Sequence, residues 1–237
     1  MNPREQQGKE MLRKAREWMV QGEIGMITYW ADRRKCPPSP RLYCGPKPEN
    51  AFGKALSDYE TQLALEESFK GPLATPPFTS PAEIRRRLGN HVEIDNPVVN
   101  LTQDIIRRYA PFVVKNSHGN NGETEVDVAE KDSRLLHALS RRVHTGGAMI
   151  ARAKFNIHPN EITELAEAGR INELEAFLRD EKAEQRALVR IGDKASTLEK
   201  GPEESAMFYQ QILFPLTLKS EALYLGKEWE NLGKSLV

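Results

Sequence analysis

Apolar residues recur along most of this chain three or four positions apart, which is the spacing of amphipathic helices. The clearest run lies in the middle of the chain, with no proline to interrupt it, and its members are Leu135, Leu136, Leu139, Val143, Ile150 and Ala151. No segment alternates apolar and polar residues over the length of a strand, and we find no internal repeat. The pattern predicts an all-α fold, a multi-helix bundle with one long central helix.

Segments rich in proline and glycine divide this pattern into separate helices. The breaks fall at 36–40, 71–77 and 118–122. Around them the sequence predicts helices at about 4–33, 51–69, 81–87 and 101–109, the long central helix, a short helix from 159, helices at 171–179 and 182–199, and a last one at 203–232. The 237 residues are enough for a sizeable core, and we expect a single domain over residues 1–237.

Composition narrows the class of function. The chain has 34 basic and 34 acidic residues, so it lacks the positive charge of a general binder of nucleic acid or anionic membranes. It contains no apolar run of about 18 residues, which predicts no transmembrane helix. The first residues form no apolar signal-peptide core. The expected location is the cytoplasm or, alternatively, outside the cell after removal of a signal peptide.

Two pairs of potentially reactive side chains have ordinary structural interpretations. Cys36 and Cys44 flank the first proline-rich break; they could form a disulfide in a secreted protein or stay reduced in the cytoplasm. His137 and His144 lie seven residues apart on one helical face, but no third ligand is evident. We therefore expect them to be core or hydrogen-bonded histidines and predict no metal site.

The central helix carries cations beside its apolar positions. Arg141 and Arg142 follow Leu139 and Ser140, and Lys154 lies further along the same helix. Cations are costly to bury without partners, so this arrangement suggests an anionic ligand inside the protein. The alternative is a solvated stripe in which the two arginines lie near Glu130 and Asp132.

Further polar residues occur at helical spacing elsewhere in the chain. Arg16 lies in the amphipathic N-terminal segment. Asp180 and Glu184 are four residues apart, so their carboxyl groups share one helix face, and Thr217 and Glu221 have the same spacing in the last helix.

In this order and spacing these residues resemble the all-helical chorismate mutases of the eukaryotic type. The most specific block is Leu139–His144 together with Ala153–Phe155, and the other blocks contain Arg16, the pair Asp180 and Glu184, and the segment from Phe214 to Glu221. The resemblance covers about residues 10–225. It implies an isomerase of aromatic amino acid biosynthesis, part of the shikimate pathway, that is typically a homodimer.

The reaction that the resemblance implies converts chorismate to prephenate by an intramolecular [3,3] rearrangement, which needs no metal, cofactor or covalent catalyst. By the resemblance, Arg16 and Arg142 bind the two carboxylates of the substrate. Lys154 and Glu221 face the ether oxygen, Glu221 as a carboxylic acid. Glu184 accepts from the ring hydroxyl with support from Asp180, and Thr217 binds a carboxylate or orients Glu221.

One departure from the family affects the geometry. Arg142 and Lys154 are 12 positions apart, one more than the family usually has. Residues of a regular helix advance about 100° each, so the two side chains would point about 120° apart. We predict that a helix irregularity such as a π-bulge, near Gly146–Gly147, absorbs the extra residue. If the helix is regular, the alternative is a catalytically weak or inactive mutase-like interaction protein.

A second departure concerns regulation. Many eukaryotic members respond to aromatic amino acids through an arginine pair and a Gly–Ser turn. This chain has Glu66–Glu67 and Val126–Asp127 at those places, and Gly201 where a switching threonine is found. Carboxylates cannot capture the carboxylate of an amino acid, so the sequence predicts a non-allosteric enzyme.

Overall fold

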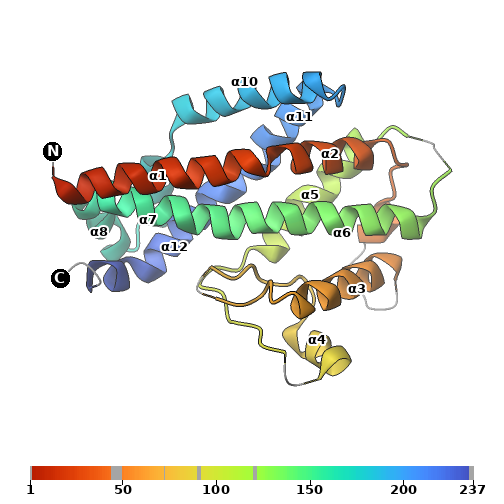
Figure 1. Cartoon of the computed structure of the whole chain (residues 1–237), viewed down its shortest axis with the longest axis horizontal. Helices are drawn as coiled ribbons and strands as arrows, with labels where there is room; N and C mark the ends of the chain where they lie inside the picture. The colour runs from red at the N-terminus through yellow and green to blue at the C-terminus, as the bar shows by residue number, and fades with distance from the viewer. Residues whose placement is uncertain (1, 44–49, 72, 90–91, 120–121, 235–237) are drawn as a thin grey trace.

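Two long helical segments lie side by side along the long axis of the molecule and run in opposite directions (Figure 1). The first consists of α1 (Pro3–Gln21) and α2 (Glu23–Arg34), and the second of α6 (Glu125–Arg141), a π-helical turn η2 (Arg142–Gly146) and α7 (Gly147–Ile157). α1 packs on α7, and α2 packs on α6. The structure is a computed structural model that describes residues 2–43, 50–71, 73–89, 92–119 and 122–234.

A third long segment crosses behind this pair (Figure 1). It consists of α11 (Pro202–Phe208), a second π-helical turn η3 (Tyr209–Leu213) and α12 (Phe214–Lys234). α12 packs on α7 and on the short helices α8 (Pro159–Glu167) and α9 (Ile171–Leu178). Helix α10 (Glu181–Thr197) packs on α11 and α2.

The remaining elements lie around α6, the N-terminal half of the central helix. They are the 3₁₀ turn η1 (Pro40–Tyr43), α3 (Ala51–Leu65), α4 (Pro81–Leu88) and α5 (Thr102–Asn116). α3 and α5 pack on α6, and α4 packs on α3. The main apolar core lies between the long segments, and a small second cluster lies between α3 and α4, formed by Ala64, Phe69, Ile84, Val92 and Ile94.

Local capping signals set several helix starts. Pro3 and Pro81 occupy first-turn positions, behind the N-caps Asn2 and Ser80. Thr124 and Asp127 form a capping box at the start of the central helix, in which each side chain bonds the backbone of the other residue. Asp180 accepts a hydrogen bond from the Ala183 amide at 2.9 Å and so caps α10.

A polar cluster, built around a fully buried ion pair, joins four elements at the end of the bundle away from the chain termini. Arg33 of α2 donates to Asp132 of α6 at 2.5 Å, and neither side chain is exposed. Tyr43 and Tyr109 donate to the same carboxylate, each at 2.5 Å. Ser117 accepts from Arg33 at 3.0 Å. These contacts satisfy a buried ion pair that would otherwise be costly.

The structure confirms the predicted all-α fold and the long central helix, and no strand occurs in the described ranges. None of the described helices combines the length and apolar character needed to cross a membrane.

Three predicted helix boundaries were wrong. The helix predicted at 101–109 is too short, because α5 continues to Asn116 with Pro111 inside it. Pro111 lies on the exposed face, where the carbonyl that loses its bond can face water. The helix predicted at 51–69 ends at Leu65, and the predicted segment 4–33 divides at Gly22.

The possible disulfide stays a prediction, because Cys44 lies outside the described residues. Cys36 is buried and its thiol donates to Glu123 at 2.8 Å. Burial, together with this hydrogen bond, raises the pKa of the thiol to about 11.

Candidate active site

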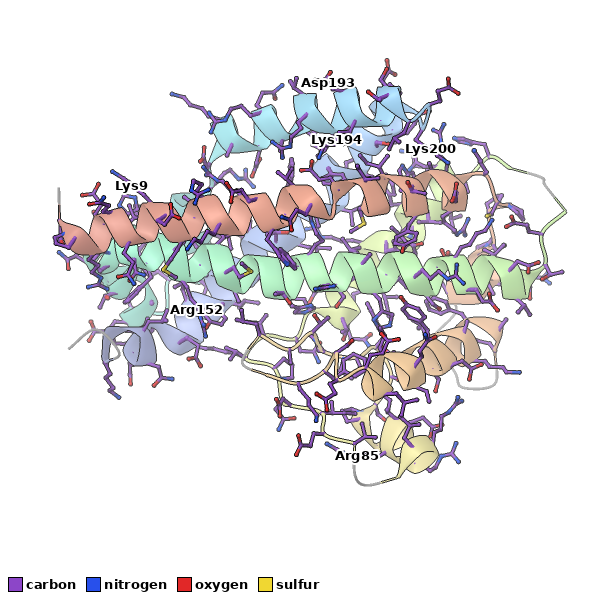
Figure 2. The ribbon with its side chains drawn as sticks, in the orientation of Figure 1. Lys9, Arg85, Arg152, Asp193, Lys194 and Lys200 are labelled. Carbon is purple, nitrogen blue, oxygen red and sulfur yellow. The ribbon has the colours of Figure 1, made fainter. Side chains whose placement is uncertain are left out.

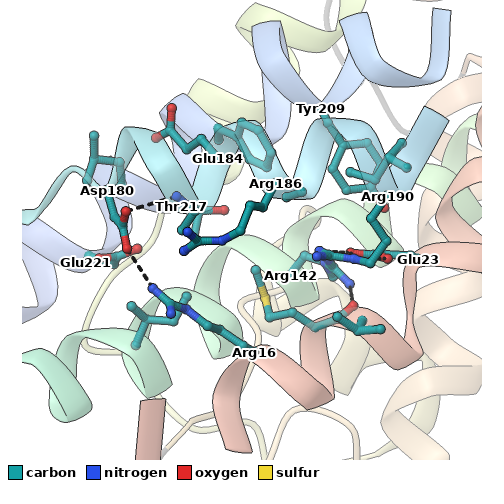
Figure 3. Close-up of a pocket in the computed structure, with 18 of the residues that line it drawn as sticks. Arg16, Glu23, Arg142, Asp180, Glu184, Arg186, Arg190, Tyr209, Thr217 and Glu221 are labelled. Carbon is teal, nitrogen blue, oxygen red and sulfur yellow. Dashed lines mark hydrogen bonds and ion pairs between the residues drawn. The ribbon is translucent and has the colours of Figure 1, made fainter. Parts of the chain in front are cut away.

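A half-open cavity of about 190 Å³ lies between α1, the central helix, α10 and α12 (Figure 3). All seven residues that the sequence singled out line this cavity: Arg16, Arg142, Lys154, Asp180, Glu184, Thr217 and Glu221. They come from four separate segments of the chain, so only tertiary packing brings them together.

The π-helical turn at Arg142–Gly146 confirms the predicted irregularity of the central helix. A π turn accommodates one more residue than an α-helical turn over nearly the same length. The 12-residue separation of Arg142 and Lys154 therefore does not turn the two side chains away from each other, and both line the same cavity. The irregularity begins at Arg142 and ends just before Gly147, where the sequence placed it.

Arg142 is a buried cation held by neutral groups. Its side chain donates to the Met19 carbonyl and lies over the Tyr209 ring at 5.9 Å. The residue is only 6% exposed, and its buried Nε has no hydrogen-bond partner in the described part of the chain. Burial lowers the pKa of Arg142, but the guanidinium group stays charged near neutral pH. A buried cation without a carboxylate bonded to it is suited to bind an anionic ligand.

Gly22 makes room for this arginine. A Cβ atom at Gly22 would lie 3.2 Å from Nη1 of Arg142, closer than a side chain comfortably allows. The guanidinium group of Arg142 therefore lies against the backbone at Gly22, the boundary between α1 and α2.

Lys154 and Glu221 form the most enclosed pair in the cavity. Nζ of Lys154 lies 2.6 Å from Oε2 of Glu221, and their side chains are 14% and 5% exposed. Lys154 also donates to the Leu178 carbonyl. Burial raises the pKa of Glu221, although Lys154 opposes this shift. The pair thus combines a fixed ammonium donor with a carboxyl group that is easier to protonate than an exposed one.

Arg16 and Asp180 form an ion pair at the more open end. Nη2 of Arg16 lies 2.8 Å from Oδ2 of Asp180, and both side chains are about two-fifths exposed (Figure 3). The pKa of Asp180 is lowered: desolvation raises it, but the Ala183 amide and Arg16 together outweigh that effect. Glu184, one turn into α10, is half-buried, and burial raises the pKa of its carboxyl group.

Thr217 lines the cavity but donates to the Leu213 carbonyl at 2.9 Å rather than to Glu221. It follows the second π-helical turn, Tyr209–Leu213, which the sequence reasoning missed. Pro215 was the available signal, because proline has no N–H for the helix ladder and removes one backbone hydrogen bond from the turn before it. Thr217 and Glu221 both line the cavity from the helix that follows this turn.

Gly147 brings α7 and α12 together at the cavity. A Cβ atom there would lie 2.8 Å from Oγ and 2.9 Å from Cβ of Ser220. Ser220 directly precedes Glu221, so this close approach fixes how near Glu221 comes to Lys154.

The sequence reasoning also missed a charged cluster next to Arg142. Glu23 is 1% exposed and binds Arg190 at 2.7 Å and Lys194 at 2.8 Å. Lys194 also donates to the Val20 carbonyl at 3.2 Å, next to the boundary between α1 and α2 (Figure 2). Arg190 and Lys194 are four residues apart on α10, which was the only sequence signal.

A further missed residue is Arg186, which lines the same cavity. Figure 3 shows its guanidinium group pointing toward the end where Arg16, Asp180 and Thr217 lie.

The histidines have the structural roles predicted for them. Nε2 of His144 accepts from the Leu101 amide at 2.9 Å, so its Nδ1 carries the proton and donates to the Ser140 carbonyl at 2.9 Å. Burial lowers the pKa of His144 to about 4. His137 is buried between aromatic rings, with Nε2 3.1 Å from Glu60. Within the described ranges no group of three potential ligands could hold a metal ion.

No family model matches the chain. A chorismate mutase of Emericella nidulans is 29% identical over 186 residues, which are 70% of this chain and 66% of that protein. One of Schizosaccharomyces pombe is 25% identical over 242 residues, 92% of this chain and 96% of that protein. The chain spans just under two thirds of the length of the first relative and about half, 53%, of one from Pichia angusta.

Solved structures share the fold. The chloroplast chorismate mutase of Zea mays superposes with a TM-score of 0.74 at 21% identity, over 92% of this chain and 95% of that one. A Candida albicans chorismate mutase in complex with L-Trp gives a TM-score of 0.69 at 19% identity, over 94% of both chains. A third neighbour, at 20% identity, holds phenylalanine in an allosteric site. These comparisons confirm the resemblance and the all-helical fold predicted from the sequence.

Proposed function

We propose that this chain is a chorismate mutase that converts chorismate to prephenate in the cavity between α1, α7, α10 and α12. The observation that carries the proposal is that the seven matched polar residues line one cavity. They do so although the extra residue between Arg142 and Lys154 would point these two side chains apart in a regular helix. Since the π-helical turn removes that separation, the alternative of an inactive interaction protein loses the feature that favoured it.

The residue types suit the reaction. The substrate carries two carboxylates and rearranges through a compact transition state in which the breaking ether oxygen gains negative charge. A protein accelerates such a step by holding the compact conformer and by placing fixed donors around that oxygen. Arg142 supplies a buried, planar cation for a carboxylate. Glu184 supplies an acceptor for the ring hydroxyl.

The pair Lys154 and Glu221 would act on the ether oxygen. Lys154 is already held by Glu221 and the Leu178 carbonyl, so little reorganisation is needed when charge develops on the substrate. An ionised Glu221 would repel that charge, whereas protonated Glu221 can donate a hydrogen bond. The raised pKa of Glu221 favours the protonated form.

We further propose that the chain forms one mutase domain over residues 1–237, that it acts as a homodimer and that it serves aromatic amino acid synthesis. The cytoplasmic location expected from the sequence stays a prediction.

The expectation that aromatic amino acids do not regulate the chain rests on Glu66–Glu67, Val126–Asp127 and Gly201. It conflicts with the structural neighbours, whose complexes with L-Trp and phenylalanine link this fold to effector binding. We therefore do not retain it.

The test is turnover of chorismate by the purified chain, followed by the loss of chorismate absorbance and by chromatography of the product against authentic prephenate. We expect turnover by the wild type, near-complete loss in Arg142→Gln and no loss in Arg108→Gln. Arg108 lies on the exposed face of α5, away from the cavity, and controls for the loss of one arginine. Absence of turnover by folded wild-type protein would overturn the proposal.

A further inference from the structure

The place of the π-helical turn along the central helix decides whether Arg142 reaches the cavity. Arg142 is the first residue of the turn, so the extra residue is absorbed between Arg142 and Lys154. A π turn that lay one helical turn earlier would precede Arg142. Twelve regular steps would then separate Arg142 from Lys154, and the two side chains would point about 120° apart. Something must therefore hold the π turn where it is.

Two consecutive side chains of the π turn bind segments outside the central helix. Nε2 of His144 accepts from the Leu101 amide at 2.9 Å, and Oγ1 of Thr145 donates to the Leu73 carbonyl at 3.0 Å. A shift of one residue rotates a helical side chain by about 100°. Both bonds would therefore break if the π turn formed elsewhere along the helix.

The bond made by Thr145 is unusual for a threonine in a helix. A helical threonine commonly donates to the carbonyl four residues earlier, as do Thr61, Thr197 and Thr217. Thr145 instead donates across to another segment. Its single hydroxyl hydrogen is then used, so the Thr75 hydroxyl, 3.4 Å away, is the donor in the contact between the two threonines.

The segment that accepts this bond is itself fixed. Residues 74–78 are buried although they form no helix, and Pro76 and Pro77 restrict their backbone. At the end of the segment, the carboxylate of Glu60 on α3 accepts from the backbone amides of Phe78 and Thr79, the latter at 3.0 Å. The Leu73 carbonyl is thus attached to a rigid support and can hold the π turn.

We propose that Thr145 is a positioning residue for substrate binding, because its bond to Leu73 keeps the π turn in the register that points Arg142 into the cavity. This inference deepens the proposed function and rests on it. Thr145 is not one of the described residues that line the cavity, so it acts through Arg142 and does not touch the substrate. Losing the bond lowers the fraction of molecules with Arg142 in place. That raises KM by the inverse of the fraction and leaves kcat unchanged at saturation.

The test compares Thr145→Val, which keeps the shape and removes the hydroxyl, with Thr145→Ser, which keeps the hydroxyl. The matched control is Thr61→Val, because Thr61 is half-buried like Thr145 but its hydroxyl bonds only within α3. Loss of one hydrogen bond should raise KM for chorismate roughly three- to tenfold in Thr145→Val. Its kcat should stay within about twofold of the wild type. KM should return to near the wild-type value in Thr145→Ser and stay there in Thr61→Val. A general loss of stability would instead lower kcat, because less of the enzyme would be folded.

Amide hydrogen exchange of residues 142–147 provides a second measurement that does not depend on turnover. Exchange should be faster in Thr145→Val than in the wild type and in Thr61→Val, because the π turn opens more readily. With an active wild type, an unchanged KM or unchanged exchange in Thr145→Val would overturn the inference and leave the proposed function intact. If folded wild-type protein does not turn over chorismate, the proposed function fails. Exchange alone then decides whether Thr145 holds the π turn: faster exchange in Thr145→Val supports that hold, and equal exchange refutes it.

Discussion

Replacing Gly147 by alanine tests how closely α7 and α12 must approach for the active site to form. The backbone at Gly147 is ordinary right-handed helix, with φ −59° and ψ −47°, so alanine meets no dihedral strain. The new Cβ atom would lie 2.8 Å from Oγ and 2.9 Å from Cβ of Ser220. Rotation of the Ser220 side chain can move Oγ but not Cβ, which is fixed by the backbone of a buried residue, so relief of the contact requires α7 and α12 to separate.

The magnitude follows from comparison with Gly192→Ala. Gly192 lies in α10, and nothing is within 4 Å of the position its Cβ would take. Both substitutions gain the same intrinsic helix propensity, about 0.8–1.0 kcal/mol. Their difference in unfolding free energy therefore reports overpacking at Ser220, which we expect to be about 1–3 kcal/mol.

Urea denaturation of the two variants and the wild type measures this difference. Gly192→Ala should be more stable than the wild type, and Gly147→Ala less stable than Gly192→Ala. Adding Ser220→Gly to Gly147→Ala removes both crowded atoms and should recover most of the loss, as a double-mutant cycle would show. Equal stabilities for Gly147→Ala and Gly192→Ala would refute the close approach. Because Ser220 precedes Glu221, kcat/KM of Gly147→Ala should fall as well.

Two further substitutions test the frame of the site. Deleting Gly146 shortens the separation of Arg142 and Lys154 to 11 residues, which a regular helix places about 20° apart. The deletion variant should fold and keep its mutase activity, whereas insertion of one alanine after Gly146 should abolish activity. Loss of activity in the folded deletion variant would contradict the account of the π turn. Asp132→Asn leaves the buried Arg33 without a carboxylate and should cost about 3–5 kcal/mol of unfolding free energy in urea denaturation; a cost below about 1 kcal/mol would show that the polar cluster contributes little.

The sequence predicted the helices from local spacing, and the π turn from that counting together with the family resemblance, which requires Arg142 and Lys154 to share one cavity. Apolar spacing marks each buried helix face, and the number of residues between Arg142 and Lys154 reveals that a regular helix cannot point both into one cavity. Pro111 and Pro215 mark the limit of this reasoning. Each proline removes one backbone hydrogen bond from its helix, but the outcomes differ. α5 continues past Pro111 as an α-helix, whereas a second π-helical turn precedes Pro215. In both places the helix continues because tertiary packing stabilises it as a whole.

The sequence predicted the site residues that belong to the family motif, but not the other charged residues of the site. Glu23, Arg190 and Lys194 contact one another only after α10 folds over the boundary between α1 and α2, and no spacing in the sequence joins positions so far apart. The pairing of Arg16 with Asp180 likewise depends on how α10 is placed relative to α1. Which cation is paired and which is free is a property of the packed structure.

The dependence of kcat/KM on pH in the wild type, Glu221→Gln and Lys154→Ala tests the central claim most directly. Burial raises the pKa of Glu221, so the carboxylic acid that can donate to the ether oxygen is present below that pKa and is lost as pH rises through it. The wild type should therefore lose activity toward alkaline pH. Glu221→Gln, whose amide is a donor at every pH, should stay active with a flat profile. Lys154→Ala should lose about 2.7–4 kcal/mol of transition-state stabilisation at every pH. An inactive Glu221→Gln together with an active Lys154→Ala would contradict the account.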